Sequence, residues 1–103
     1  EVALPSQVAT SLALAANELI QNALEHAFVD RTRGSVVISL SSASGQLVVE
    51  VRDDGVGLSE TTTRHLGLEI VEALVREDLK GEWSLASNEG TTARLTIPIP
   101  KGV

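Results

Sequence analysis

The longest regular pattern in the chain lies between residues 7 and 28, where apolar side chains recur at steps of three and four residues. Such a period is typical of a helix that buries one face. The segment is rich in good helix formers and contains neither glycine nor proline. Pro5 precedes it and Ser6 is a suitable N-cap residue, so we expect the helix to begin there. The apolar positions of its expected buried face are Leu12, Ala16, Leu19, Ile20, Ala23, Leu24 and Ala27.

Alternating apolar and polar positions follow this helix and predict β-strands. Ser35–Ser41 and Gln46–Asp53 are two such segments, and the turn residues Ser42–Gly45 between them indicate a hairpin. A second pair of strands is expected at Glu82–Ser87 and Thr92–Pro98.

A shorter helix is expected between the two strand pairs, opening at Gly67 and ending near Asp78. Its expected core face is Leu68, Val71, Leu74 and Val75. The polar segment Leu58–His65 before it is interpreted as a loop. With a further strand ending at Leu4, this order of elements predicts an α+β fold. We expect a two-layer α/β sandwich, with a mixed, mostly antiparallel sheet of about five strands and helices packed on one face.

The composition is that of one ordinary globular domain over residues 1–103, with 43% hydrophobic and 21% charged residues. The sequence has no initiator methionine, and we interpret it as part of a longer protein. No apolar run approaches the roughly 20 residues that span a bilayer, so direct membrane insertion is not expected.

Composition also excludes several classes of function. The chain has no cysteine, which excludes disulfides, thiolate nucleophiles and cysteine-bound zinc. A net charge of −6, with a single Trp and a single Phe, argues against a nucleic-acid surface. The chain also lacks the P-loop and the G-x-S-x-G nucleophile elbow.

Polar residues interrupt the apolar pattern at two places. Glu18, Asn22 and His26 stand four residues apart, so a helix places them in one row along the edge of the apolar face. Asp53 continues the inward apolar row of its strand, where an unpaired carboxylate would be costly. Either Asp53 caps local backbone amides, or it receives a hydrogen-bond donor from a ligand.

Four motifs together resemble those of the GHKL ATPase superfamily. Asn17–Ala27 is similar to its N box, and Asp53–Gly57 is similar to its D-x-G-x-G motif. Leu66–Val71 and Gly90–Thr92 resemble its second and third glycine motifs, in the family's order. Within the superfamily, the chain most resembles the catalytic ATP-binding domains of bacterial sensor histidine kinases, in the group with a short ATP lid. The resemblance implies the Bergerat fold.

The resemblance also implies a role for each motif residue, with ATP and Mg²⁺ as cofactors. Asn22 would ligate Mg²⁺ through its amide oxygen, and Glu18 would orient or deprotonate the attacking group or hold a metal-bound water. Asp53 would accept a hydrogen bond from the adenine amino group, and Thr91 would support the pocket beside it. The other implied nucleotide-binding residues are His26, Gly55, Gly57, Arg64, His65, Gly67 and Leu68.

The implied function is that of a two-component sensor histidine kinase. Its catalytic domain would transfer the γ-phosphoryl of Mg-ATP to a histidine on a separate dimerisation helix, since neither histidine of this chain has the context of an acceptor. The implied partners are ATP, the dimerisation and phosphoacceptor domain of the same kinase and, indirectly, a response regulator. We expect a cytoplasmic domain whose parent is either soluble or membrane-anchored.

Other interpretations stay open at this point. An anti-sigma-factor type serine protein kinase has the same fold and the same Glu–Asn spacing. A non-catalytic nucleotide-binding module is a third alternative, against which the intact Glu18 and Asn22 argue. Considered singly, Glu18 and Asn22 could also be a solvated helix edge, Asp53 a turn cap, and His26 a cation favoured by the helix dipole.

Overall fold

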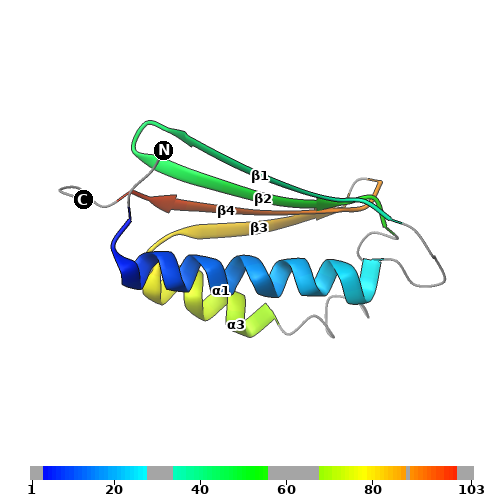
Figure 1. Ribbon diagram of the computed structural model, residues 1–103, viewed down its shortest axis with the longest axis horizontal. Helices are drawn as coiled ribbons and strands as arrows, with labels where there is room; N and C mark the ends of the chain where they lie inside the picture. The colour runs from blue at the N-terminus through cyan, green and yellow to red at the C-terminus, as the bar shows by residue number, and fades with distance from the viewer. Residues whose placement is uncertain (1–3, 28–33, 56–67, 88, 100–103) are drawn as a thin grey trace.

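A four-stranded antiparallel sheet with helices on one face forms the described part of this computed structural model, residues 4–27, 34–55, 68–87 and 89–99 (Figure 1). The strand order is β1-β2-β4-β3, so the two inner strands come from different hairpins. The strands are β1 Val36–Ala43, β2 Gln46–Asp53, β3 Glu82–Ser87 and β4 Thr91–Pro98. The predicted α+β fold with two layers is therefore confirmed.

The number of strands differs from the expectation of about five. Four strands lie in the described ranges, and every pair of them is antiparallel rather than mixed. The additional strand was expected to end at Leu4, and Leu4 is not in a strand. The other residues of that expected strand, 1–3, lie outside the described residues.

The long helix α1 spans Ser6–Asn22 and continues as a π-helical segment, Ala23–Ala27. Pro5, not Ser6, occupies the N-cap position, so the predicted cap is wrong by one residue. The carbonyl of Pro5 accepts the first helical hydrogen bond, from the backbone N–H of Ala9 at 2.9 Å. Ser6 is already helical, and its carbonyl accepts a hydrogen bond from the Thr10 hydroxyl at 2.8 Å.

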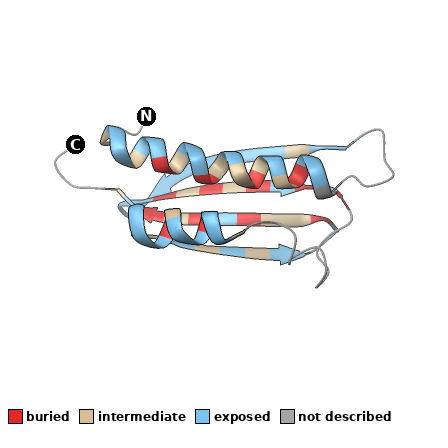
Figure 2. Ribbon diagram, turned by 90° about the horizontal axis from the view of Figure 1, so that it is seen from below, coloured by how far each residue is buried: buried red, intermediate tan, exposed pale blue. Residues whose placement is uncertain are grey.

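The buried face of α1 is centred on Ala15, Leu19 and Ala23, which form a band along the side facing the sheet (Figure 2). Leu24 was expected on this face and is 60% exposed, so that prediction is wrong. The apolar stripe of α1 is broader than the helix face that the sheet can cover. Leu24 belongs to the stripe but lies beyond the edge of the covered face. Ser11 is buried instead, because its hydroxyl donates to Asp78 Oδ2 at 3.0 Å.

The core lies between the two inner strands on one side and α1 with the second helical segment on the other. In β2, Leu47, Val49 and Val51 are buried, and each pairs with a buried residue of β4. These partners are Ile97, Leu95 and Ala93. The same row ends with Asp53 opposite Thr91, so the pairing that builds the core also places these two polar residues side by side.

The edge strand β1 is more exposed than the inner strands. Ile38 and Leu40 pair with buried residues of β2, yet they are 54% and 64% exposed. Neither side chain is among those that form the core or pack against it. The turn into β2 holds Ser44 and Gly45, both with positive φ, as two-residue hairpin turns require.

The second helical segment consists of α3, Leu68–Ala73, followed by a π-helical segment, Leu74–Asp78. Val71 and Val75 are fully buried, and Leu68 and Leu74 pack against the core, which confirms the predicted core face. No helix within the described ranges has both the length and the apolar character needed to cross a membrane.

Candidate functional site

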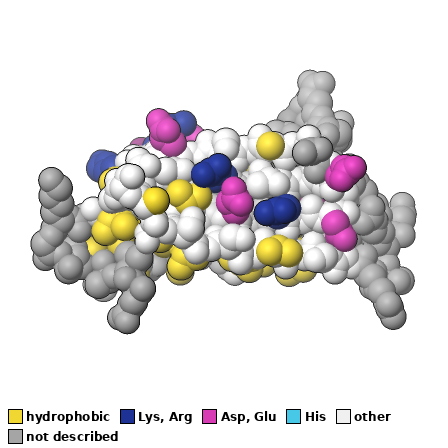
Figure 3. Space-filling model, turned by 90° about the horizontal axis from the view of Figure 1, so that it is seen from above, with side chains coloured by type: hydrophobic (Ala, Val, Ile, Leu, Met, Phe, Trp, Pro, Cys, Tyr) yellow, Lys and Arg dark blue, Asp and Glu magenta, His cyan; other side chains and the backbone are white. Residues whose placement is uncertain are grey.

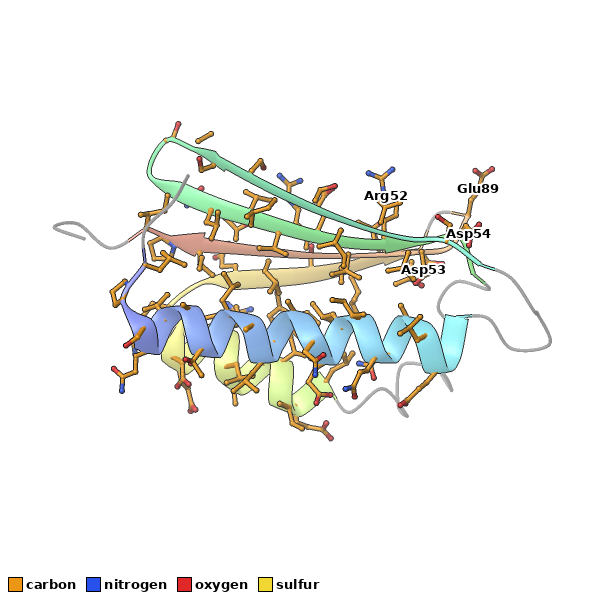
Figure 4. All side chains as sticks on the ribbon, viewed as in Figure 1. Arg52, Asp53, Asp54 and Glu89 are labelled. Carbon is orange, nitrogen blue, oxygen red and sulfur yellow. The ribbon has the colours of Figure 1, made fainter. Side chains whose placement is uncertain are left out.

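The predicted site residues on β2, β4 and α1 gather at one end of the molecule. This end holds the last residues of β2, the first residues of β4 and the carboxyl end of α1 (Figures 1 and 4). The antiparallel order of β2 and β4 brings together motifs that are 38 residues apart.

Asp53 is held by two backbone amides at this end of the sheet. Its side chain is on the helix-facing side of β2, and the residue is 7% exposed. Oδ1 accepts hydrogen bonds from the backbone N–H of Gly55 at 2.9 Å and of Thr91 at 3.2 Å. Both hydrogen bonds that Asp53 makes with described residues go to Oδ1. The capping role is confirmed, and the role in adenine binding stays a prediction.

Gly90 makes this arrangement possible, and sequence reasoning assigned it no separate role. It is buried, has φ +128°, and packs against the backbone at the end of β2. A Cβ at this position would overlap the carbonyl oxygen of Asp53 and lie 3.1 Å from Cα of Asp54. A glycine is therefore required for the β3–β4 turn to reach Asp53 and for Thr91 to donate to it.

Gly90→Ala is expected to destabilise the fold by about 2–3 kcal/mol, because both the positive φ and the backbone overlap oppose a side chain. Gly45→Ala is the matched control, since Gly45 also has positive φ but has open space around it. Its cost should be about 1 kcal/mol. Urea unfolding of both variants measures the difference, and equal losses would contradict the close-approach argument.

Asn22 presents an unsatisfied polar atom at the end of α1. It is the last residue of the α-helix, and its side-chain Nδ2 is buried with no hydrogen-bond partner among the described residues. Such a group costs about 1–3 kcal/mol unless a ligand or ion completes it. The amide can be turned over, so either its nitrogen or its oxygen can face the site.

The predicted Mg²⁺ fits this amide. Glu18 lies one turn earlier on α1 and is half-buried like Asn22, so both stand on the rim of the core as predicted. A Mg²⁺ that bridges phosphates needs only one or two protein oxygens. The described residues contain no group of three His, Cys, Asp or Glu that could hold a metal alone.

Of the row predicted for Glu18, Asn22 and His26, the structure describes the side chains of Glu18 and Asn22. His26 lies in the π-helical segment, where the four-residue period changes. Its side chain lies outside the described residues. Leu68, the first residue of α3, is half-buried. The predicted site residues Gly57, Arg64, His65 and Gly67 lie outside the described residues.

A hollow of about 500 Å³ opens at the same end of the sheet. Two of its lining residues, Arg52 and Glu89, point away from the helices (Figure 4). Figure 3 shows this face of the sheet, on which basic and acidic side chains lie next to one another.

The polar side chains of the hollow are largely paired within the chain. Glu50 forms ion pairs with two arginines: Oε1 lies 3.9 Å from Nη2 of Arg52, and Oε2 lies 3.8 Å from Nη1 of Arg94. Asp54 Oδ1 accepts a hydrogen bond from the backbone N–H of Ser35 at 2.9 Å. The residues that line the hollow are Ser35, Val37, Glu50, Arg52, Asp53, Asp54, Glu89 and Thr92. Asp53 thus borders both this hollow and the helix-side site, and the sequence did not predict the hollow.

Comparison with known families matches residues 7–101 to the sequence profile of the histidine kinase-, DNA gyrase B-, and HSP90-like ATPases. Sensor histidine kinase PdtaS of Mycobacterium tuberculosis is 39% identical over 103 residues, covering 93% of this chain and 21% of that protein. Blue-light-activated histidine kinase 2 of Erythrobacter litoralis is 38% identical over 104 residues, covering 95% of this chain and 30% of that protein. The chain thus spans a fifth to a third of the length of these relatives.

Solved structures show the same likeness. The Erythrobacter litoralis EL346 blue-light activated histidine kinase superimposes with a TM-score of 0.85 at 36% identity, over 96% of this chain and 33% of that chain. The catalytic domain of histidine kinase ThkA superimposes with a TM-score of 0.74 at 22% identity, over 87% of this chain and 66% of that chain. At that identity, the second likeness shows the fold alone.

Proposed function

Since this chain belongs to the histidine kinase-, DNA gyrase B-, and HSP90-like ATPase family, we propose that it is the ATP-binding catalytic domain of a sensor histidine kinase. It would bind Mg-ATP at the end of the molecule that carries Asn22 and Asp53. One observation supports this most: a buried carboxylate joins two separate motifs, accepting the amides of Gly55 and Thr91 through a single oxygen.

The adenine side of the site would be read by Asp53. An adenine amino group donates hydrogen bonds, and Oδ2 of a carboxylate held by two amides is a fixed acceptor for one of them. Because Asp53 is buried and anchored to backbone on both sides, little conformational entropy is lost when the base binds. Gly55, also buried, leaves room for the base beside the backbone.

The phosphate side would be arranged by α1. Mg²⁺ supplies charge neutralisation for the phosphates when bound, and the amide oxygen of Asn22 would hold it. Glu18, one turn away, would orient the attacking group or accept its proton. A nitrogen of the acceptor histidine would attack the γ-phosphorus while the bond to the β–γ bridging oxygen breaks, and ADP would leave. Such a reaction asks mainly for positioning and charge stabilisation.

The partners follow from the same proposal. The acceptor histidine would belong to the dimerisation and phosphoacceptor domain of the same kinase, and a response regulator would receive the phosphoryl group afterwards. We place the domain in the cytoplasm, where ATP is available. The serine-kinase alternative is not favoured, because relatives that are 38–39% identical are named histidine kinases.

Calorimetric titration of the chain with ATP, with and without Mg²⁺, tests the proposal directly. We expect saturable binding that Mg²⁺ tightens roughly tenfold, because the cation bridges the phosphates and Asn22. Adenosine should bind more weakly than Mg-ATP and without a dependence on Mg²⁺. Absence of saturable ATP binding under both conditions would refute the proposed function.

A further inference from the structure

We propose that Asp54 is a positioning residue whose side chain directs the backbone after β2, so that the Gly55 amide stays on Asp53. The Ser35 N–H donates to Asp54 Oδ1 at 2.9 Å, and the Asp54 N–H donates to the Ser35 carbonyl at 3.2 Å. These two bonds join the residue before β1 to the residue after β2. The inference rests on the proposed adenine recognition and assigns a task to the position that the D-x-G-x-G motif leaves open.

The pairing of β1 with β2 shows what the Asp54 side chain does. The last paired residues of the two strands are Val36 and Asp53, so Ser35 and Asp54 would form the next pair. In a regular antiparallel ladder, such a pair exchanges two hydrogen bonds between backbone groups. Here the Ser35 N–H donates to the Asp54 side chain instead. The carboxylate thus closes the ladder, and the main chain can leave the sheet at Asp54.

The turn that follows brings Gly55 back to Asp53. The Gly55 N–H donates to Asp53 Oδ1, two residues earlier, which is the geometry of an Asx turn. On its other side, this backbone packs against Gly90, where a Cβ would lie 3.1 Å from Cα of Asp54. The end of β2 is therefore held between the β3–β4 turn and Ser35.

The two amides that hold Asp53 are placed by different means. The Thr91 amide is placed by the β2–β4 register, in which Asp53 and Thr91 are paired. Gly55 belongs to no strand, so the direction in which the chain leaves β2 decides where its amide lies. Asp54 is exposed and Asp53 is buried, and their side chains diverge at the end of β2 (Figure 4). Asp54 therefore acts on the site through the backbone.

Amide hydrogen exchange of the ligand-free chain tests the positioning itself. Asp54→Ala removes the acceptor of the Ser35 N–H. We expect exchange of the Gly55 amide to accelerate roughly tenfold and exchange of the Thr91 amide to change less than twofold, because only the first depends on the Asp54 side chain. A merely structural role would lower stability and accelerate both amides together. Equal changes at the two amides, or no change at Gly55, would overturn the inference.

The ratio of Mg-ATP to Mg-GTP affinity tests the link to adenine. In Asp54→Ala the Asp53 carboxylate keeps one of its two amides, so the acceptor for the adenine amino group loses its fixed direction. By calorimetry on the whole 103-residue chain, we expect the ATP affinity to fall roughly fivefold and the GTP affinity to change less than twofold. Asp54→Asn keeps an acceptor oxygen for the Ser35 N–H and should restore most of the loss.

Ser35→Pro tests the same bond from its other end. Proline removes the N–H donor and is tolerated at the start of an edge strand such as β1. It should lower the ratio about as much as Asp54→Ala, and the double variant should lose little more, since both changes remove one bond. Glu82→Ala is the matched charge control. Glu82 is an exposed acidic residue at the start of β3, away from Asp53, and its loss should leave the ratio and both amides unchanged.

The inference and the proposed function can fail separately. If the unsubstituted chain binds Mg-ATP and the ratio stays unchanged in Asp54→Ala and Ser35→Pro, the inference is overturned and the proposed function survives. If the unsubstituted chain binds no ATP, the proposed function and the link from Asp54 to adenine both fail. Hydrogen exchange then still decides whether Asp54 holds the Gly55 amide.

Discussion

Asn22→Ala is expected to reduce Mg-ATP-dependent autophosphorylation of the full-length kinase on the order of 1,000-fold. The substitution removes the amide oxygen proposed to hold Mg²⁺, and a missing contribution to charge stabilisation in phosphoryl transfer costs about 4 kcal/mol. Stability should not fall in parallel. The variant removes a buried Nδ2 that has no partner among the described residues, and Ala is a better helix former.

Radioactive phosphate incorporation into the kinase, together with thermal unfolding, separates these two effects. Asn17→Ala is the matched control, because Asn17 is exposed on the same helix and carries the same side chain. It should retain nearly full activity. Retained activity in Asn22→Ala would rule out the assignment of the metal to this residue, and loss of folding in both variants would point to helix damage.

Asp53→Asn is expected to weaken ATP binding about 100-fold, which corresponds to about 2.7 kcal/mol. The carbonyl of the new side chain can still accept from Gly55 and Thr91, so the anchor is retained. The atom that faces the ligand changes from an acceptor to an amide donor. It then opposes the amino group of adenine, which is also a donor.

Purine specificity provides the sharpest measurement of this effect. Guanine carries an acceptor oxygen at the position of the adenine amino group, so the amide donor of Asp53→Asn suits guanine better than adenine. In this variant the ratio of ATP affinity to GTP affinity should therefore fall by more than the ATP affinity itself. Asp54→Asn is the matched control, because it makes the same chemical change at the adjacent, exposed residue, whose Oδ1 accepts the Ser35 amide. An ATP affinity that is unchanged in Asp53→Asn would refute its role in adenine recognition.

Local patterns predicted most of the fold. The alternation of apolar residues located β2 and β3 to the residue, and it placed β4 within one residue of its start. The three- and four-residue period located α1 and the core face of α3. These predictions hold because each depends on which side chains lie on one face of a single helix or strand. The sequence of that one segment fixes this face through its residue spacing.

Burial was harder to predict than secondary structure. Leu24 and Leu40 lie on apolar patterns and remain exposed, whereas Ser11 is buried. Hydropathy indicates which side chains favour burial, but the packing of both helical segments against the sheet decides which of them are covered. Ser11 is buried because Asp78, 67 residues away, accepts its hydroxyl. No local pattern contains that partner.

For the candidate site, the sequence by itself determined the chemistry: an acid and an amide one turn apart at Glu18 and Asn22, and a carboxylate where an apolar row should continue at Asp53. Tertiary structure alone decided how these groups are held. The β2–β4 register sets the Thr91 amide on Asp53, and the absence of a side chain at Gly90 lets the turn approach. The hydrogen bond from the Trp83 indole N–H to the Glu72 carboxylate likewise joins β3 and α3, which are separate segments of the chain. Residue types and spacings can be read along the chain, but hydrogen bonds between distant segments exist only after packing has brought their donors and acceptors together.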